Sequence, residues 1–196
     1  MINIFLEAKN LKTPEAKFVE VLLRVIGASS TQYRVVPLGG KDTLEVSKNH
    51  FLQNTAEGGT NLIIFDADTQ SNNGGYEKRK SELLTKIREL GINAELFLWP
   101  DDNRDGDVET LLDDIARHDL HNRFFGCFND YECCLGNDYL HPNRKGKLYT
   151  YITSMHLTKR QRDAIGSGDW LFENPDYWNL DSPILEPIKS FLRRYL

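Results

Sequence analysis

The feature that most constrains the fold of this chain is an apolar run that ends in two acids, Leu62–Phe65 followed by Asp66 and Asp68. The run is short and lacks polar alternation, which is typical of a strand buried on both faces of a parallel sheet. Open α/β sheets bind ligands at the carboxyl ends of such strands. Two carboxylates there repel each other unless a proton or a cation intervenes, and Mg²⁺ prefers oxygen ligands. The sequence therefore predicts a magnesium site at the mouth of a parallel sheet.

Strand and helix patterns alternate four times over residues 1–117. Apolar runs predict the strands, and apolar stripes at helical spacing, with Thr13 and Asp107 as helix N-caps, predict the helices. The expected strands cover residues 2–6, 33–38, 62–65 and 94–99, and the expected helices follow Thr13, cover 43–52 and 77–90, and follow Asp107. This alternation predicts an α/β fold with a parallel sheet of about four strands and helices on both faces.

The alternation is lost after about residue 117. The remaining segment is rich in aromatic and turn residues and ends in an expected helix over residues 183–195. A chain of 196 residues can hold one sizeable core and an appendage. We therefore expect residues 1–117 to form the α/β core and residues 118–196 to form a C-terminal appendage, mainly helical or irregular, that packs on it.

The composition, 40% hydrophobic and 27% charged, is that of an ordinary globular protein. The N-terminal segment has no basic region and too short an apolar run for a signal peptide, and no apolar stretch approaches the length of a membrane span. Cys127, Cys133 and Cys134 are odd in number and include a vicinal pair, which argues against a secreted disulfide framework. We expect a cytoplasmic protein with reduced thiols and no membrane partner.

The net charge of −5 does not indicate nucleic-acid binding, but the charges are segregated along the chain. Residues 95–119 contain nine acids and two bases, whereas residues 139–162 contain six bases and no acid. Tyr149 and Tyr151 lie among these bases. An acidic metal site beside a basic, aromatic surface suits an enzyme that acts on phosphodiesters. Two solvated faces of opposite charge are the alternative interpretation.

Acidic side chains follow three of the four expected strands. Glu7 follows the first strand, Asp66 and Asp68 follow the third, and the segment 101–109, which includes Glu109, follows the fourth. Parallel strands point the same way, so their carboxyl ends meet at one edge of the sheet. We therefore expect these acids to lie close together.

These motifs resemble those of the Toprim superfamily, which topoisomerases, bacterial primases, small ribonucleases and overcoming-lysogenization-defect-type nucleases share. The family has a Glu at the end of its first strand and Asp-x-Asp at the end of a later hydrophobic strand, which here are Phe5–Glu7 and Phe65–Asp68. The tracts Leu38–Gly40 and Gly106–Leu112 look like those of compact, stand-alone Toprim-like proteins. The resemblance covers residues 1–117 and implies a Toprim-like, Rossmannoid sheet.

The resemblance implies Mg²⁺-dependent cleavage of DNA or RNA, with Mn²⁺ as a possible substitute. Glu7 would act as general acid/base or as a metal ligand, and Asp66 and Asp68 would be catalytic and hold the metal. Glu109 would complete the metal shell or position water. The ion would offset charge on the transferring phosphoryl group and lower the pKa of bound water. A protein partner for substrate delivery is also possible for so small a chain.

Nucleic-acid contacts are expected from bases near the proposed site and from the basic segment. These residues are Lys9, Lys41, Arg144, Lys145, Lys147, Lys159, Arg160 and Arg162.

One position departs from the family pattern. Toprim families usually follow the first Glu with Gly and, a few residues on, with Asp, whereas Glu7 is followed by Ala8-Lys9-Asn10. The acid that is missing at Asn10 removes a possible metal ligand. A catalytically inactive module that binds a metal, a nucleotide or a partner is therefore the alternative to an active nuclease.

Four further interpretations compete with the nuclease. Phe65–Thr69 also resembles the first motif of haloacid dehalogenase-like phosphatases, although Gln70 stands where that family has a small hydroxyl residue. Glycosyltransferases likewise place Asp-x-Asp after a buried strand. Asp101–Val108 matches the first eight positions of an EF-hand calcium loop, but Leu112 stands at position twelve. Zinc is the fourth, although no finger spacing fits the candidate ligands, which are His118, His121, Cys127, Cys133, Cys134 and His141.

Overall fold

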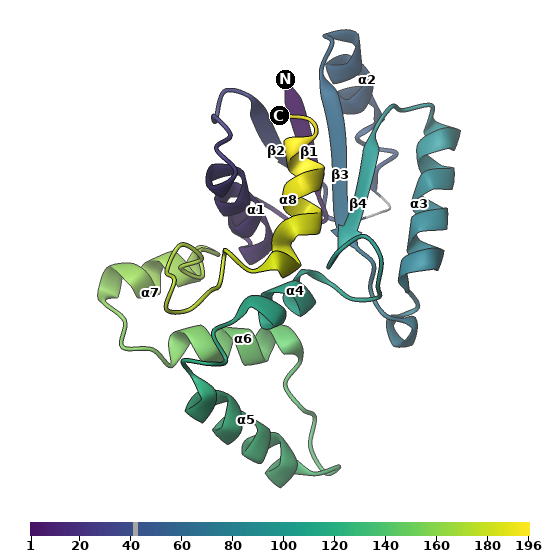
Figure 1. The fold of residues 1–196 in the computed structure, drawn as a ribbon. Helices are drawn as coiled ribbons and strands as arrows, with labels where there is room; N and C mark the ends of the chain where they lie inside the picture. The colour runs from purple at the N-terminus through teal and green to yellow at the C-terminus, as the bar shows by residue number, and fades with distance from the viewer. Residues whose placement is uncertain (41–42) are drawn as a thin grey trace.

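A computed structural model describes residues 1–40 and 43–196 (Figure 1). Its centre is a parallel sheet of four strands in the order β2-β1-β3-β4. The strands are β1 (Ile2–Leu6), β2 (Tyr33–Pro37), β3 (Thr60–Asp66) and β4 (Glu95–Trp99). The predicted α/β fold with a parallel sheet is therefore confirmed. Lys41, one of the expected nucleic-acid contacts, lies outside the described residues.

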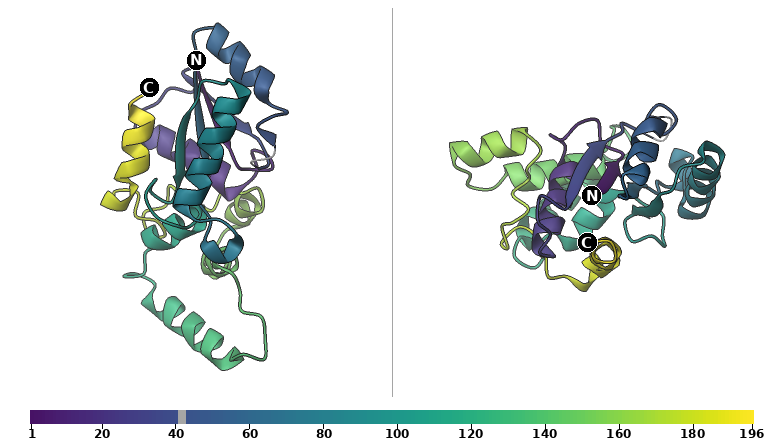
Figure 2. Two further views of the ribbon diagram at one scale, coloured as in Figure 1. Left: turned by 90° about the vertical axis from the view of Figure 1, so that its right-hand side faces the viewer. Right: turned by 90° about the horizontal axis from the view of Figure 1, so that it is seen from above.

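Helices cover both faces of the sheet, as predicted (Figure 2). Successive strand residues point to opposite faces, so Ile4 and Leu6 join one buried cluster while Phe5 joins the other. The first cluster is completed by α1 (Pro14–Val25) and α8 (Glu186–Arg193), and the second by α2 (Lys48–Ala56) and α3 (Tyr76–Leu90). This two-sided burial explains why the strands read as continuous apolar runs.

Two helices that carry site residues begin where the sequence predicts. Thr13 caps α1 by accepting a hydrogen bond from the Ala16 N–H, and Pro14 occupies the first helical position. Asp107 caps α4 (Val108–Ile115) in a capping box with Thr110. Both caps lie at the carboxyl edge of the sheet, so they fix the first turns of α1 and α4 beside the strand ends.

The helix expected over residues 43–52 is displaced along the chain. It runs instead from Lys48 to Ala56, with Glu57 as its C-cap residue before Gly58. The buried amide of Asn61 explains the shift, because it donates to the Phe51 carbonyl at 3.2 Å and to Thr55 Oγ1 at 3.0 Å. These bonds fix the second half of the helix against β3, a tertiary effect that the local pattern does not contain.

The C-terminal segment forms α5 (Asn122–Leu135), α6 (Arg144–Thr153), α7 (Lys159–Gly166) and α8. The helix expected over 183–195 is the short turn η3 (Pro183–Leu185) followed by α8. Leu148 and Tyr151 of α6 belong to the same buried cluster as the β1 residues. In contrast, α5 projects from the body (Figures 1 and 2). Within the described residues, no helix is long and apolar enough to cross a membrane.

Candidate functional site

The carboxyl edge of the sheet brings the ends of β1 and β3 together with the first turn of α4. Glu7 directly follows β1, and Asp66 is the last residue of β3. The Asp66 N–H donates to Glu7 Oε2 at 3.3 Å, and the Val108 N–H at the start of α4 donates to Asp66 Oδ1 at 2.9 Å. Gly40 also lies here, because a Cβ at that position would be 3.7 Å from Glu7 Oε1. The end of β1, the end of β3 and the first turn of α4 thus form one site.

Glu15 belongs to this site, although its sequence context marks it only as an acid in the first turn of a helix. It is 7% exposed, and the Trp99 Nε1–H donates to its Oε1 at 3.2 Å. A signal was present in the sequence, because Glu15 precedes Phe18 and Leu22 by three and seven residues. It therefore lies on the apolar stripe of α1, which faces the core.

The four carboxylates Glu7, Glu15, Asp66 and Glu109, hereafter the carboxylate cluster, influence one another. Burial is the main cause that raises the pKa of Glu15 to about 8; the Glu7 and Glu109 charges act in the same direction, and the Trp99 hydrogen bond and the Lys145 charge oppose them. Burial also raises the pKa of Asp66 well above its usual range, as do the Glu15, Glu109 and Glu7 charges. Ionised together, these groups repel one another, so the cluster favours protons or a cation.

Lys145 of α6 supplies positive charge to the carboxylate cluster. Its Nζ donates to Glu109 Oε1 at 2.8 Å. Burial lowers the pKa of Lys145, but the hydrogen bond to Glu109 and the charges of Glu109, Asp66 and Glu15 outweigh it, so the pKa is raised. The site thus combines acids from residues 1–117 with a base from residues 118–196.

Asp68 has a different partner from Asp66. Its φ of +58° turns the chain away from the direction of β3, and its Oδ2 forms an ion pair with Nη2 of Arg79 on α3. The Asp68 carbonyl accepts from the Gly106 N–H at 2.8 Å. Arg79 is 8% exposed, so this ion pair is largely buried on the Arg79 side. The two acids of the Asp-x-Asp motif are therefore directed to different partners.

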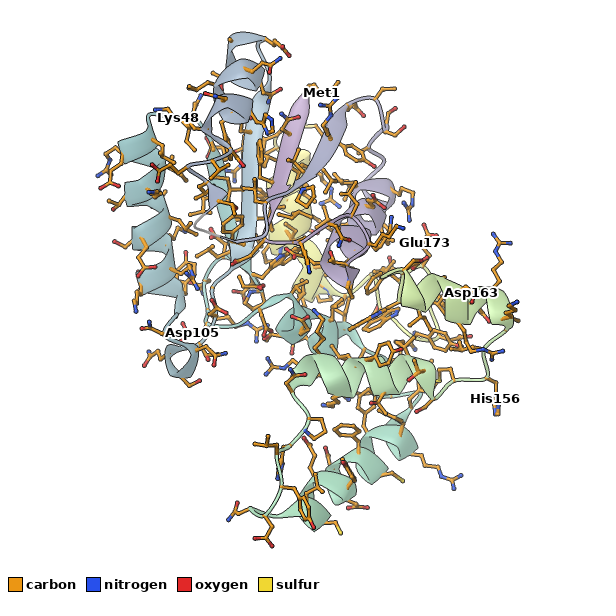
Figure 3. The ribbon with its side chains drawn as sticks, turned by 180° about the vertical axis from the view of Figure 1, so that it is seen from behind. Met1, Lys48, Asp105, His156, Asp163 and Glu173 are labelled. Carbon is orange, nitrogen blue, oxygen red and sulfur yellow. The ribbon has the colours of Figure 1, made fainter. Side chains whose placement is uncertain are left out.

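The acids that follow β4 have separate structural roles. Asp101 pairs with Arg104, Asp102 pairs with Lys80, and Asp105 accepts from the Tyr76 N–H at 2.7 Å at the start of α3. The labelled Asp105 in Figure 3 lies at that end of α3. The segment with the EF-hand-like spacing thus forms a polar loop that caps two helices.

In donor type alone, the carboxylate cluster would suit a hard divalent cation. Carboxylate oxygens are the ligands that Mg²⁺ prefers, and mutual repulsion makes a cation favourable here. Within the described residues, no group of three or more His, Cys, Asp or Glu side chains is arranged to hold a metal ion as it stands. The zinc interpretation gains no support, since Cys127, Cys133 and Cys134 are all exposed.

The expected nucleic-acid contacts divide into two groups. On α6, Arg144 donates to Asp107 Oδ1 at 3.3 Å, and Lys147 donates to Asp113 Oδ2 at 3.1 Å, so that with Lys145 all three α6 bases pair with acids of α4 or its N-cap. The acidic and basic segments of the sequence therefore face each other.

The second group is exposed. It consists of Lys9 after β1 and of Lys159, Arg160 and Arg162 on α7. Arg162 donates to the Leu157 carbonyl at 2.6 Å, whereas Lys159 and Arg160 form no ion pair with the acids of the described chain. Lys159 and Arg160 are thus available to an external anion.

Comparisons of the chain with protein-family models, with curated proteins and with solved structures found no match.

The raised pKa of Glu15 predicts a stability that depends on pH. The folded protein favours the protonated carboxyl, so the contribution is complete below the ordinary value of 4.5 and is lost as pH rises through about 8. Glu15→Gln can still accept from Trp99 but cannot ionise. In EDTA, we expect it to be increasingly more stable than wild type between pH 5 and pH 8.5, by about 1.4 kcal/mol per unit of pKa shift. Urea unfolding of both proteins at the two pH values measures the difference in their free energies of unfolding. A difference that does not change with pH would contradict the prediction.

The Asp68–Arg79 pair predicts coupled effects on stability. Asp68→Asn leaves the Arg79 guanidinium buried without its main counter-charge. We expect a loss of about 2–3 kcal/mol, below the range for a fully buried pair, because the Asp68 side chain is 29% exposed. Adding Arg79→Leu to Asp68→Asn should recover most of the lost stability. A double-mutant cycle, with free energies from urea unfolding, measures this coupling. Additive single effects would contradict the coupling.

Proposed function

We propose that this chain is a Toprim-type phosphodiesterase that cleaves nucleic acid with Mg²⁺ as its cofactor. The single observation that carries the proposal is the carboxylate cluster at the carboxyl edge of the parallel sheet, where α/β proteins bind ligands. One member follows β1 and the others lie in α1, β3 and α4, and the charges of the cluster raise the pKa values of Glu15 and Asp66. The Toprim resemblance of Phe5–Glu7 and Phe65–Asp68 supports the same chemistry.

Within this proposal, Glu7, Asp66 and Glu109 would hold the ion. The bound ion would neutralise charge on the phosphoryl group and lower the pKa of water. The buried Glu15 keeps its proton near neutral pH, since burial raises its pKa to about 8. This limits the negative charge that the site must balance. The pairing of Asp68 with Arg79 supports a positioning role for Asp68, which fixes the loop after β3 against α3.

The surroundings of the site support a nucleic-acid substrate in the cytoplasm. Lys159 and Arg160 offer exposed positive charge on α7, which suits a phosphate backbone. The three cysteines are exposed and unpaired, which suits a reducing compartment. A protein partner that delivers the substrate is compatible with the projecting helix α5 (Figure 1).

A binding module without turnover is the second candidate. Two observations favour it: Lys145 already pairs with Glu109, and Arg79 already pairs with Asp68. Asn10, in place of the acid usual in Toprim families, would explain a loss of activity. In that case the acids would bind a metal, a nucleotide or a partner without forming product.

A cleavage assay on single-stranded, duplex and structured DNA and RNA tests the proposal. With Mg²⁺ or Mn²⁺, we expect cleavage that EDTA abolishes and that Asp66→Asn lowers about a hundredfold or more, since the variant removes a charge at the reacting centre. The matched control is Asp114→Asn, which removes an acid of α4 that pairs with Arg104 outside the cluster. The control should cleave like wild type.

Other outcomes of this assay separate the candidates. Wild-type protein that binds Mg²⁺ but yields no product from any substrate would favour the binding module. Cleavage that survives in Asp66→Asn would refute the carboxylate cluster as the active site.

The exposed bases of α7 predict a salt-dependent contribution to nucleic-acid binding. Replacing Lys159 and Arg160 with Gln should weaken binding and lower the slope of log affinity against log salt by about 1 for each phosphate that the variant no longer neutralises. The matched control replaces Lys48 and Arg88 with Gln. Lys48 lies at the opposite end of the molecule from α7, which carries Asp163 (Figure 3). Equal slopes for both double variants would exclude α7 from the interface.

A further inference from the structure

The N-terminal half of α6 lies against α4 through three ion pairs. Arg144 pairs with the N-cap Asp107 at 3.3 Å, Lys145 with Glu109 at 2.8 Å, and Lys147 with Asp113 at 3.1 Å. The pairs follow one another along both helices. The acids of the three pairs differ. Glu109 belongs to the carboxylate cluster, whereas Asp107 is the N-cap of α4 and Asp113 lies in α4, and neither belongs to the cluster.

Lys145 therefore differs from its two neighbours in what it neutralises. The charges of Glu109, Asp66 and Glu15 all act on it. Its side chain is 57% exposed while that of Glu109 is 12% exposed, so the ammonium reaches into the cluster from the solvent side. Lys147 is 19% exposed and its Nζ lies 5.4 Å from the centre of the Phe125 ring. Among the described residues, Lys145 is thus a counter-cation of the cluster at Glu109, and Lys147 is part of the packing.

We propose that Lys145 is a built-in competitor of the metal ion: its ammonium and a divalent cation exclude each other at Glu109. This inference rests on the metal that the proposed function assigns to the cluster. A divalent cation that binds Glu109 oxygens must displace the Lys145 ammonium from Oε1, or the two cations repel each other at the same carboxylate. Because such coupling is reciprocal, the affinity that Lys145 has for Glu109 lowers the affinity of the metal.

The structure lets Lys145 leave at little cost. Its side chain is already more than half exposed, so its release leaves no buried charge on α6. The helix stays attached, because Leu148, Tyr151 and Ile152 are fully buried in the main cluster. The competition therefore sets the metal concentration at which the site fills, without unfolding the C-terminal helices.

Titration calorimetry with Mg²⁺ and with Mn²⁺ tests the competition. Lys145→Met should tighten metal binding by at least about tenfold, a ratio that corresponds to about 1.4 kcal/mol. Lys147→Met is the matched control, since it removes an equal charge and an ion pair to the same helix, and it should bind metal like wild type. Lys145→Arg keeps the charge and should also bind like wild type.

Acylation of lysines in the wild-type protein gives a second test that needs no variant. Mass spectrometry should show that Mg²⁺ raises the modification of Lys145, because the ammonium is released from Glu109, while the modification of Lys147 stays constant. Protection of Lys145 by Mg²⁺, or an equal rise at both lysines, would overturn the proposal. This measurement decides the matter if Lys145→Met fails to fold.

The failure of this inference differs from that of the proposed function. Equal metal affinity in wild type and Lys145→Met would refute the competition and leave the metal site intact. Equal tightening by both Met variants would show a general charge effect and would also refute it. No metal binding in any variant would refute the competition together with the proposed metal cofactor.

Discussion

The crowding of four carboxylates at one edge of the sheet is the constraint on which the rest of the structure depends. Different elements position them: Glu7 and Asp66 lie at strand ends, and Glu15 and Glu109 lie in the first turns of α1 and α4. Buried like charges are unfavourable, and the protein offsets them with a proton on Glu15, the Val108 N–H at Asp66, and Lys145 at Glu109. Through Lys145, α6 thus contributes to the charge balance of the acids that would serve the chemistry.

The sequence predicts the parts of the site that depend on strand direction. Glu7, Asp66 and Glu109 come together because parallel strands end at one edge, a rule that needs only the element order. Glu15 depends on how α1 packs over Trp99, a contact between residues far apart in the chain. Its position on an apolar stripe was the available signal, but an acid in a first helical turn also has a local explanation in the helix dipole.

Asp68 shows where reasoning from a motif stops. The i, i+2 spacing places two side chains on the same side only while the strand continues, and β3 ends at Asp66. The turn at Asp68 and the buried Arg79 then determine its direction. The helices α5, α6 and α7 were not individually predicted for a similar reason. Their aromatic residues pack in tertiary contacts, as Tyr151 does with Phe124, Phe125 and Trp178, so no simple periodic stripe marks them.

The packing of the C-terminal helices explains the segregation of charge along the sequence. The separate acidic and basic segments of the sequence suggest a metal site beside a nucleic-acid surface, or two solvated faces, whereas in the structure the α6 bases pair with acids of α4 and its N-cap. An attraction between segments some 35 residues apart fixes α6 on the mouth of the sheet. The site therefore cannot be assigned to residues 1–117 alone: without α6, Glu109 would keep its neighbours Asp66 and Glu15 and lose its cation. Any cation that acts in this site must either replace Lys145 or share the cluster with it.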